Sequence, residues 1–143
     1  MMWMTLEELY IQCDKKGIDV YYFPLRHSSV KGIALPDGTI AIDTDKISTR
    51  VEEKEVLAHE LAHIETESFY NVYSDCDIKS KQERRAETHA IKKLIPQNEL
   101  EKAIKKGKTA LWELAEEFEV SCHLMKKAVE YYNTQPSFCK KLQ

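Results

Sequence analysis

The stretch TRVEEKEVLAHELAHIETE, residues 49–67, is the longest helical pattern in the chain and contains neither proline nor glycine. Leu57 and Leu61 recur at helical spacing, which predicts one face packed in the core. His59 and His63 are also four residues apart, so both imidazoles project from one side of the helix. The stretch therefore predicts a buried helix that carries two neighbouring histidines.

The segment His59-Glu60-Leu61-Ala62-His63 is an HExxH motif, a pattern typical of zinc sites. Glu60 lies about 100° around the helix from His59, beside a bound ion rather than on it. From there its carboxylate can take a proton from the attacking water, as a general base does. The motif predicts Zn²⁺ as the cofactor, His59 and His63 as metal ligands, and Glu60 as the catalytic residue.

A catalytic zinc ion takes three protein ligands, and we expect the third from the next helix, residues 80–95. In that helix Glu83 and Glu87 share a face with Ala86 and Ala90, while arginines and lysines take the opposite side. A carboxylate on an apolar face is costly to bury unless it is paired or bound to a metal. We therefore predict Glu83 as the third zinc ligand and Glu87 as the acceptor that orients a ligand histidine. The alternative, in which both are surface glutamates making i,i+4 contacts, stays open.

The remaining pattern predicts one helix and a small sheet ahead of the motif, and helices after it. Residues 5–16 have helical spacing, residues 18–23 are β-branched and aromatic, and Pro36-Asp37-Gly38 joins residues 31–35 and 39–42 in a hairpin. Later helices are expected over 97–106, 109–118 and 121–132. The predicted fold class is α+β: a mainly helical, minimal zincin-like fold with a small, mostly antiparallel three-stranded sheet and an HExxH active-site helix.

A length of 143 residues fits a single domain. We expect residues 1–48 to form the first helix and the sheet, and residues 49–96 the active-site helices. Residues 97–132 are expected to form the C-terminal helices, followed by a loose tail over 133–143.

Composition and charge indicate which cellular compartment and which partners to expect. Lysine and arginine number 21 against 24 acidic residues, a net charge of −3 that does not favour a nucleic-acid binder. No stretch approaches the ~18 apolar residues that a membrane span needs. The N-terminal residues lack the basic segment of a signal peptide, and the four cysteines form no CxxC pair. We expect a cytoplasmic protein without a membrane partner.

Several segments together resemble the ImmA/IrrE family of metallopeptidases from phages and mobile elements. The segments are HELAH at 59–63, QERRAETHA at 82–90 and LIP at 94–96, with weaker likeness over 31–42 and 109–132. Two positions depart from the family pattern. Glu87 stands in place of the usual Asn or Asp, and His89 in place of the usual Phe or Trp.

The resemblance implies a cytoplasmic zinc endopeptidase whose substrate is a helix-turn-helix repressor of a phage or mobile element. The implied mechanism is zincin chemistry, in which zinc polarises the scissile carbonyl, Glu60 activates water and a donor stabilises the oxyanion. The sequence does not single out that donor among Tyr70, Tyr73 and His123. An exposed strand near the site could hold an extended substrate by strand addition.

Residues 110–118 and 121–132 resemble the two helices of a helix-turn-helix. The second helix offers Lys126 and Lys127 but also Glu130, and the first carries three glutamates, so direct nucleic-acid binding is not expected. Two alternatives to an enzyme stay open. One is a non-catalytic, zinc-stabilised interaction module that sequesters a repressor, and the other is a DNA-binding regulator that uses the C-terminal helix pair.

Overall fold

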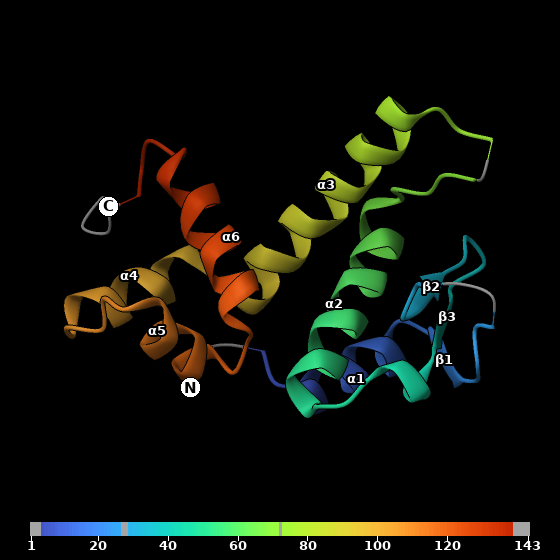
Figure 1. Ribbon diagram of the computed structural model, residues 1–143, viewed down its shortest axis with the longest axis horizontal. Helices are drawn as coiled ribbons and strands as arrows, with labels where there is room; N and C mark the ends of the chain where they lie inside the picture. The colour runs from blue at the N-terminus through green and yellow to red at the C-terminus, as the bar shows by residue number, and fades with distance from the viewer. Residues whose placement is uncertain (1–3, 27–28, 72, 139–143) are drawn as a thin grey trace.

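The computed structural model describes residues 4–26, 29–71 and 73–138, which form six α-helices and three strands (Figure 1). In chain order these elements, with one 3₁₀ helix η1, are α1 (Leu6–Lys15), β1 (Asp19–Tyr22), β2 (Gly32–Ala34), β3 (Thr39–Ile42), η1 (Thr44–Lys46), α2 (Arg50–Thr66), α3 (Cys76–Leu94), α4 (Gln97–Lys105), α5 (Leu111–Phe118) and α6 (Cys122–Asn133). The fold is α+β and mainly helical, as the sequence predicts. No helix among the described residues is long and apolar enough to cross a bilayer.

The sheet is mixed, so the prediction of a mostly antiparallel sheet is wrong. Its strand order is β1-β3-β2, in which β3 pairs antiparallel with β2 and parallel with β1. The hairpin of β2 and β3 follows from its turn, where Gly38 takes a φ of 91° that a glycine adopts without strain. No comparable local signal gives the direction of β1 relative to β3, because the alternation of side chains is the same in a parallel and in an antiparallel strand. In this strand order β3 is the central strand, and β2 lies at an edge of the sheet.

Helices α2 and α3 lie side by side at the centre of the molecule (Figure 1). Their buried positions include small residues, Ala58 and Ala62 on α2 and Ala86 and Ala90 on α3. Such residues allow two helices to approach closely. The sheet covers another side of α2, and its buried Ile40 belongs to the same core. The HExxH motif is therefore carried by the most central helix.

Helix α3 begins at Cys76, one turn earlier than the predicted residue 80. Its first turn is almost entirely exposed, so it shows no apolar periodicity from which a helix could be predicted. At the other end of the chain, Phe138 lies in the segment predicted to be a loose tail. It is buried and stacks on Tyr132. Residues 139–143 of that tail lie outside the described residues.

Two adjacent side chains of α2 hold the turn between α5 and α6. Lys54 is 2% exposed, and its Nζ donates to the carbonyl oxygens of Phe118 (2.8 Å) and Glu119 (3.3 Å) at the end of α5. The Glu55 carboxylate accepts from the Ser121 backbone N–H (2.7 Å) and hydroxyl (2.9 Å) at the start of α6. A cation thus meets a helix C-terminus and an anion a helix N-terminus, the pairing that helix dipoles favour. We call these two residues the α2 clamp.

Candidate metal centre

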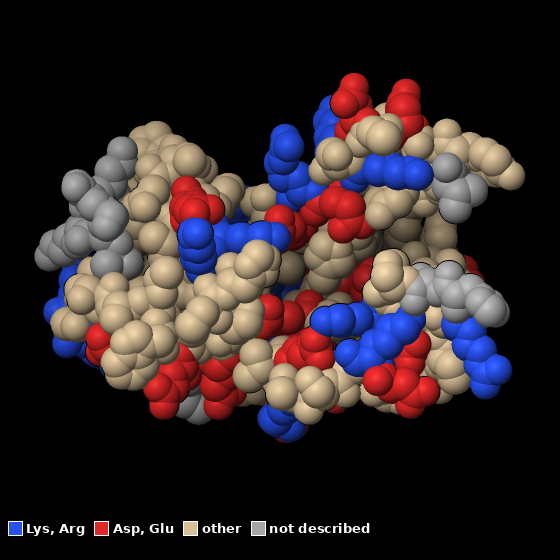
Figure 2. Space-filling model, in the orientation of Figure 1, with Lys and Arg blue, Asp and Glu red and all other residues tan. Residues whose placement is uncertain are grey.

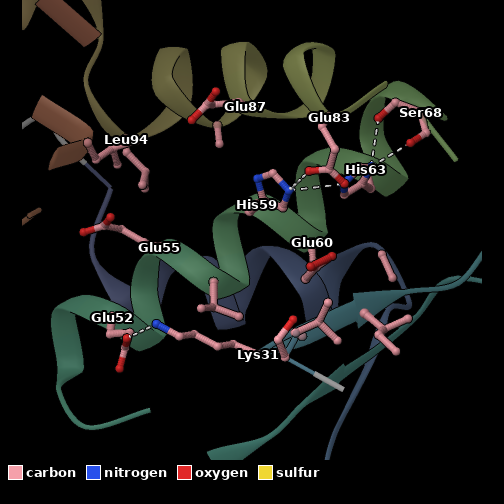
Figure 3. A pocket seen from close by; sticks show the side chains of 18 of the residues that line it. Lys31, Glu52, Glu55, His59, Glu60, His63, Ser68, Glu83, Glu87 and Leu94 are labelled. Atoms are coloured by element: carbon pink, nitrogen blue, oxygen red, sulfur yellow. Dashed lines mark hydrogen bonds and ion pairs between the residues drawn. The ribbon is translucent and has the colours of Figure 1, made fainter. Parts of the chain in front are cut away.

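Three side chains from two helices converge at one point: His59 and His63 of α2, and Glu83 of α3 (Figure 3). Glu83 Oε2 lies 2.8 Å from His59 Nε2, and Glu83 Oε1 lies 3.1 Å from His63 Nε2. The two Nε2 atoms are 3.2 Å apart. The three residues predicted from the sequence as ligands therefore form a single cluster.

The chemistry and spacing of this cluster fit a zinc ion. Two imidazoles and one carboxylate are a ligand set that catalytic zinc accepts, and ligand atoms about 2.0–2.1 Å from a tetrahedral ion lie roughly 3.3 Å from one another. The separations in the cluster, 2.8 to 3.2 Å, are close to that value. Contacts with His59, His63 and Tyr70 hold the pKa of Glu83 far below its ordinary value. Glu83 is therefore ionised at neutral pH, as a metal ligand must be.

A main-chain acceptor orients His63. Its Nδ1 donates to the carbonyl oxygen of Ser68 at 2.6 Å, and Ser68 is fully buried. This contact fixes the tautomer and leaves Nε2 facing Glu83. Ser68 reaches this place because Glu67 ends α2 in the left-handed region, at φ 52°, and turns the chain back over the helix. Sequence reasoning missed Ser68, because a carbonyl acceptor leaves no mark in the side-chain pattern.

Because the turn at Glu67 positions Ser68, a substitution that strains the backbone of Glu67 is expected to change metal affinity through His63. Glu67 and Glu119 are both exposed residues of positive φ that end helices, at 52° and 54°. A β-branched residue is tolerated there less well than glutamate, so Glu67→Val and Glu119→Val should each lower the free energy of unfolding by roughly 0.5–1 kcal/mol. Glu67→Val alone should also weaken zinc binding about tenfold or more, because the acceptor of His63 moves.

Denaturant unfolding of each variant measures stability, and competition with a fluorescent chelator measures zinc affinity. Glu119→Val is the matched control for strain at a helix end distant from the cluster. Equal zinc affinity in the two variants would show that the turn at Glu67 does not govern His63.

Glu87 does not make the contact predicted for it. Its Oε1 lies 2.6 Å from Nζ of Lys127 on α6. Within the described part of the chain, Glu87 forms no hydrogen bond with His59 or His63. Helix periodicity correctly places Glu87 one turn beyond Glu83 on the same face, but it gives no sign of a cation arriving from a segment 40 residues later. An orienting role for Glu87 stays a prediction.

Glu60 lies between the histidines and strand β2 and is 8% exposed (Figure 3). The strand can approach this closely because residue 32 is glycine. A Cβ at Gly32 would lie 2.9 Å from Val56 Cγ1 and 3.1 Å from Glu60 Cγ. Burial raises the pKa of the Glu60 carboxyl, against the opposing effect of His59 and His63. A raised pKa makes the carboxylate a stronger base, which is the direction that a general base requires.

The cluster lies in a cleft of about 1090 Å³ that follows α2. Strand β2 borders the cleft on one side, and α3 and the start of α6 border it on the other. Residues 68–71 line the end at the cluster, where Ser68 contacts His63 and Tyr70 contacts Glu83. The cleft extends from the cluster to its other end, which is lined by Ser48, Thr49, Val51 and Glu52. In the space-filling view, acidic and basic side chains are intermixed around the hollows of the face that is shown (Figure 2).

The structure separates the three residues considered as oxyanion donors. The Tyr70 hydroxyl donates to Glu83 Oε1 at 2.6 Å, and this contact raises the pKa of Tyr70 to about 12. Tyr70 therefore keeps its proton at neutral pH. His123 also lines the cleft, from the first turn of α6. Tyr73 is 93% exposed. Of the three, Tyr70 has the direct contact with the cluster.

Two histidines one turn apart, a carboxylate from the next helix and a buried glutamate thus lie together in one open cleft. The chain belongs to the peptidase family described as the IrrE N-terminal-like domain, because the family model matches residues 13–130. This match confirms the ImmA/IrrE resemblance.

Comparison with solved structures finds a protein with a similar fold. A Mycobacterium tuberculosis transcriptional regulator matches with a TM-score of 0.68 over 87% of this chain, at 15% sequence identity. This chain spans 40% of the length of that protein. No curated protein gives a significant match.

Proposed function

We propose that the chain is a zinc-dependent endopeptidase and that its substrate is a helix-turn-helix repressor of a phage or mobile element. The observation that carries this proposal is the convergence of His59, His63 and Glu83 in a cleft that Glu60 also faces. Membership in a peptidase family supports the reaction class. The repressor and a cytoplasmic location are expectations from the ImmA/IrrE resemblance.

His59, His63 and Glu83 would hold the metal. When bound there, Zn²⁺ polarises the scissile carbonyl and makes water more acidic. The Glu60 carboxylate takes a proton from the attacking water and returns it to the leaving amine. Tyr70 is the candidate oxyanion donor that touches the cluster, and its hydroxyl would have to turn from Glu83 Oε1 to donate to the oxyanion.

The form of the cleft supports internal cleavage of an extended chain. Helix α2 has 17 residues, or roughly 25 Å, and residues along most of it line the cleft. The lining residues of α2 run from Val51 to His63, about 18 Å along the helix axis, and an extended peptide of five or six residues would occupy that length at about 3.3 Å per residue. Strand β2, paired with β3 at the edge of the described sheet, borders the cleft and can hold such a peptide by strand addition.

The DNA-binding alternative has less support from the described residues. Lys127, one of the two lysines that the DNA-binding alternative would use, is paired with Glu87. The first turn of α6, which a helix-turn-helix protein would direct at bases, faces the cleft through Ser121 and His123.

The proposed function is tested by metal removal. The zinc-loaded protein is expected to cut its helix-turn-helix repressor, sought among the genes that neighbour its own, at one site, and 1,10-phenanthroline should stop cleavage until zinc is restored. Mass spectrometry of the products locates the cut, and a library of unstructured decapeptides tests cleavage independently of the repressor. Cleavage that persists in protein stripped of zinc would contradict the proposal, as would failure to cut either substrate.

A further inference from the structure

The edge strand β2 has main-chain groups to which β3 does not bind. The Leu35 N–H, one residue beyond β2, donates to the carbonyl oxygen of Thr39 at 2.8 Å, so the odd-numbered residues bond to β3. The N–H and C=O groups of Gly32 and Ala34 are directed to the other side, because these groups alternate along an antiparallel strand. Within the described residues they have no hydrogen-bond partner. We call these groups the free edge of β2, and both residues line the cleft.

The outward-facing side chains beside the free edge are apolar and exposed. Gly32 faces α2, because a Cβ there would lie 2.9 Å from Val56 Cγ1. Successive side chains of a strand point to opposite faces, so Ile33 and Leu35 project from the face of the sheet away from α2. They are 37% and 44% exposed. The neighbour of Ile33 on β3 is the small residue Ala41. Apolar surface on both side chains is therefore accessible to a further strand.

The free edge lacks the usual protection against pairing. Soluble proteins commonly guard an edge strand with charged side chains or proline, but residues 32–35 read Gly-Ile-Ala-Leu. Lys31, the charged residue just before them, is paired with Glu52 of α2. The edge therefore suits a partner that supplies main-chain hydrogen bonds and apolar side chains together. An extended peptide supplies both, and this edge borders the cleft that contains the metal cluster.

We propose that Ile33 and Leu35 select the substrate by contacting two apolar side chains of an extended peptide paired with the free edge of β2. The proposal rests on the proposed function. The peptide residues opposite Ile33 and Leu35 are two apart in the peptide sequence, and their side chains project from the same face of the sheet. The peptide residue between them directs its side chain towards α2. The substrate class is therefore an extended segment in which two apolar residues flank a single residue.

The test measures which peptides bind when cleavage is blocked. The zinc-loaded Glu60→Gln variant is incubated with a positional library of unstructured decapeptides, and bound peptides are identified by mass spectrometry. At two positions separated by one residue, Leu, Ile, Val, Phe and Tyr should be enriched about two- to fivefold over Gly, Asp and Lys. Cleavage products of the wild-type protein should show the same pattern at a fixed distance from the cut.

Two charge substitutions test which residue each position contacts. Ile33→Lys should shift the preference at one position to Asp and Glu, and Leu35→Lys should shift it at the other, because opposite charges on neighbouring strands attract. Ile11→Lys, at a residue of α1 that is 52% exposed, is the matched control and should leave both preferences unchanged. If Ile33→Lys fails to fold, Leu35→Lys carries the comparison.

N-methylation of the peptide tests the main-chain pairing independently of side-chain preference. A methyl group on a peptide nitrogen removes the hydrogen-bond donor. In a scan along the best-binding peptide, binding to Glu60→Gln should fall roughly two- to tenfold at the residues opposite Gly32 and Ala34. Methylation of the residue between them should have a smaller effect. Equal losses at all three nitrogens, or no loss at any, would contradict pairing with the free edge.

The outcomes separate this proposal from the proposed function. Cleavage by the wild type without the paired apolar preference, or with a preference unchanged in both lysine variants, would overturn selection by β2 and leave the peptidase intact. Binding with the expected pattern but no cleavage would overturn the peptidase and support selection by β2. Absence of both binding and cleavage would overturn both.

Discussion

Replacing Glu60 with glutamine is expected to lower kcat/KM for peptide cleavage by roughly 10²–10⁴-fold, with zinc content and fold unchanged. Glutamine has nearly the shape of glutamate but cannot accept the proton from the attacking water. Glu60 is also not among the three residues of the candidate ligand group, so metal binding should persist. Cleavage assays, metal analysis and circular dichroism measure the three quantities separately.

Glu52→Gln is the matched control for this change. Glu52 also lines the cleft, but it pairs with Lys31 at the end of the cleft away from residues 68–71. We expect its substitution to leave kcat within a few-fold of the wild-type value. Undiminished cleavage by Glu60→Gln would contradict the assigned base. A wild-type protein that cuts nothing, yet binds a repressor as tightly as Glu60→Gln does, would favour the non-catalytic module.

Replacing Glu83 with alanine is expected to lower zinc affinity by more than about 100-fold, beyond the loss typical of removing a residue that only supports a ligand. The change removes the carboxylate that lies 2.8 Å from His59 Nε2 and 3.1 Å from His63 Nε2. Competition with a chelator of known affinity measures the loss of zinc affinity, and metal analysis after dialysis measures how much zinc the variant retains. Unchanged zinc content would refute Glu83 as a ligand.

Two substitutions on the same helix serve as controls. Arg84→Ala removes an exposed neighbour and should leave zinc affinity unchanged. Glu87→Ala distinguishes the two roles considered for that residue. An orienting role predicts a loss of about 10–100-fold in zinc affinity, whereas a residue that only pairs with Lys127 predicts no loss.

The parts of the site that the sequence predicts are those carried by helical periodicity. Spacing of four residues brings His59 and His63 to one side of α2, and the cost of placing a carboxylate on an apolar face identifies Glu83 on α3. Both inferences depend on the period of the α-helix, 3.6 residues per turn. The structure brings these three side chains together.

The parts that sequence reasoning missed depend on contacts between distant segments. The direction of β1 is set by which edge of β3 it joins, and alternation within residues 18–23 does not encode that choice. Ser68 acts through a carbonyl oxygen. The sequence pattern singles out neither Lys54 nor Glu55, yet Lys54 is almost completely buried because α5 ends against it.

The α2 clamp attaches the C-terminal helices almost entirely through their main chain. Lys54 binds two carbonyl oxygens, and Glu55 binds one backbone N–H together with the Ser121 hydroxyl. Every amino acid has the carbonyl, and every one except proline has the N–H. Substitutions on α5 and α6 can therefore accumulate without loosening this joint. The side chains that α6 presents to the cleft can therefore change while the main-chain joint between α2 and the C-terminal helices is kept.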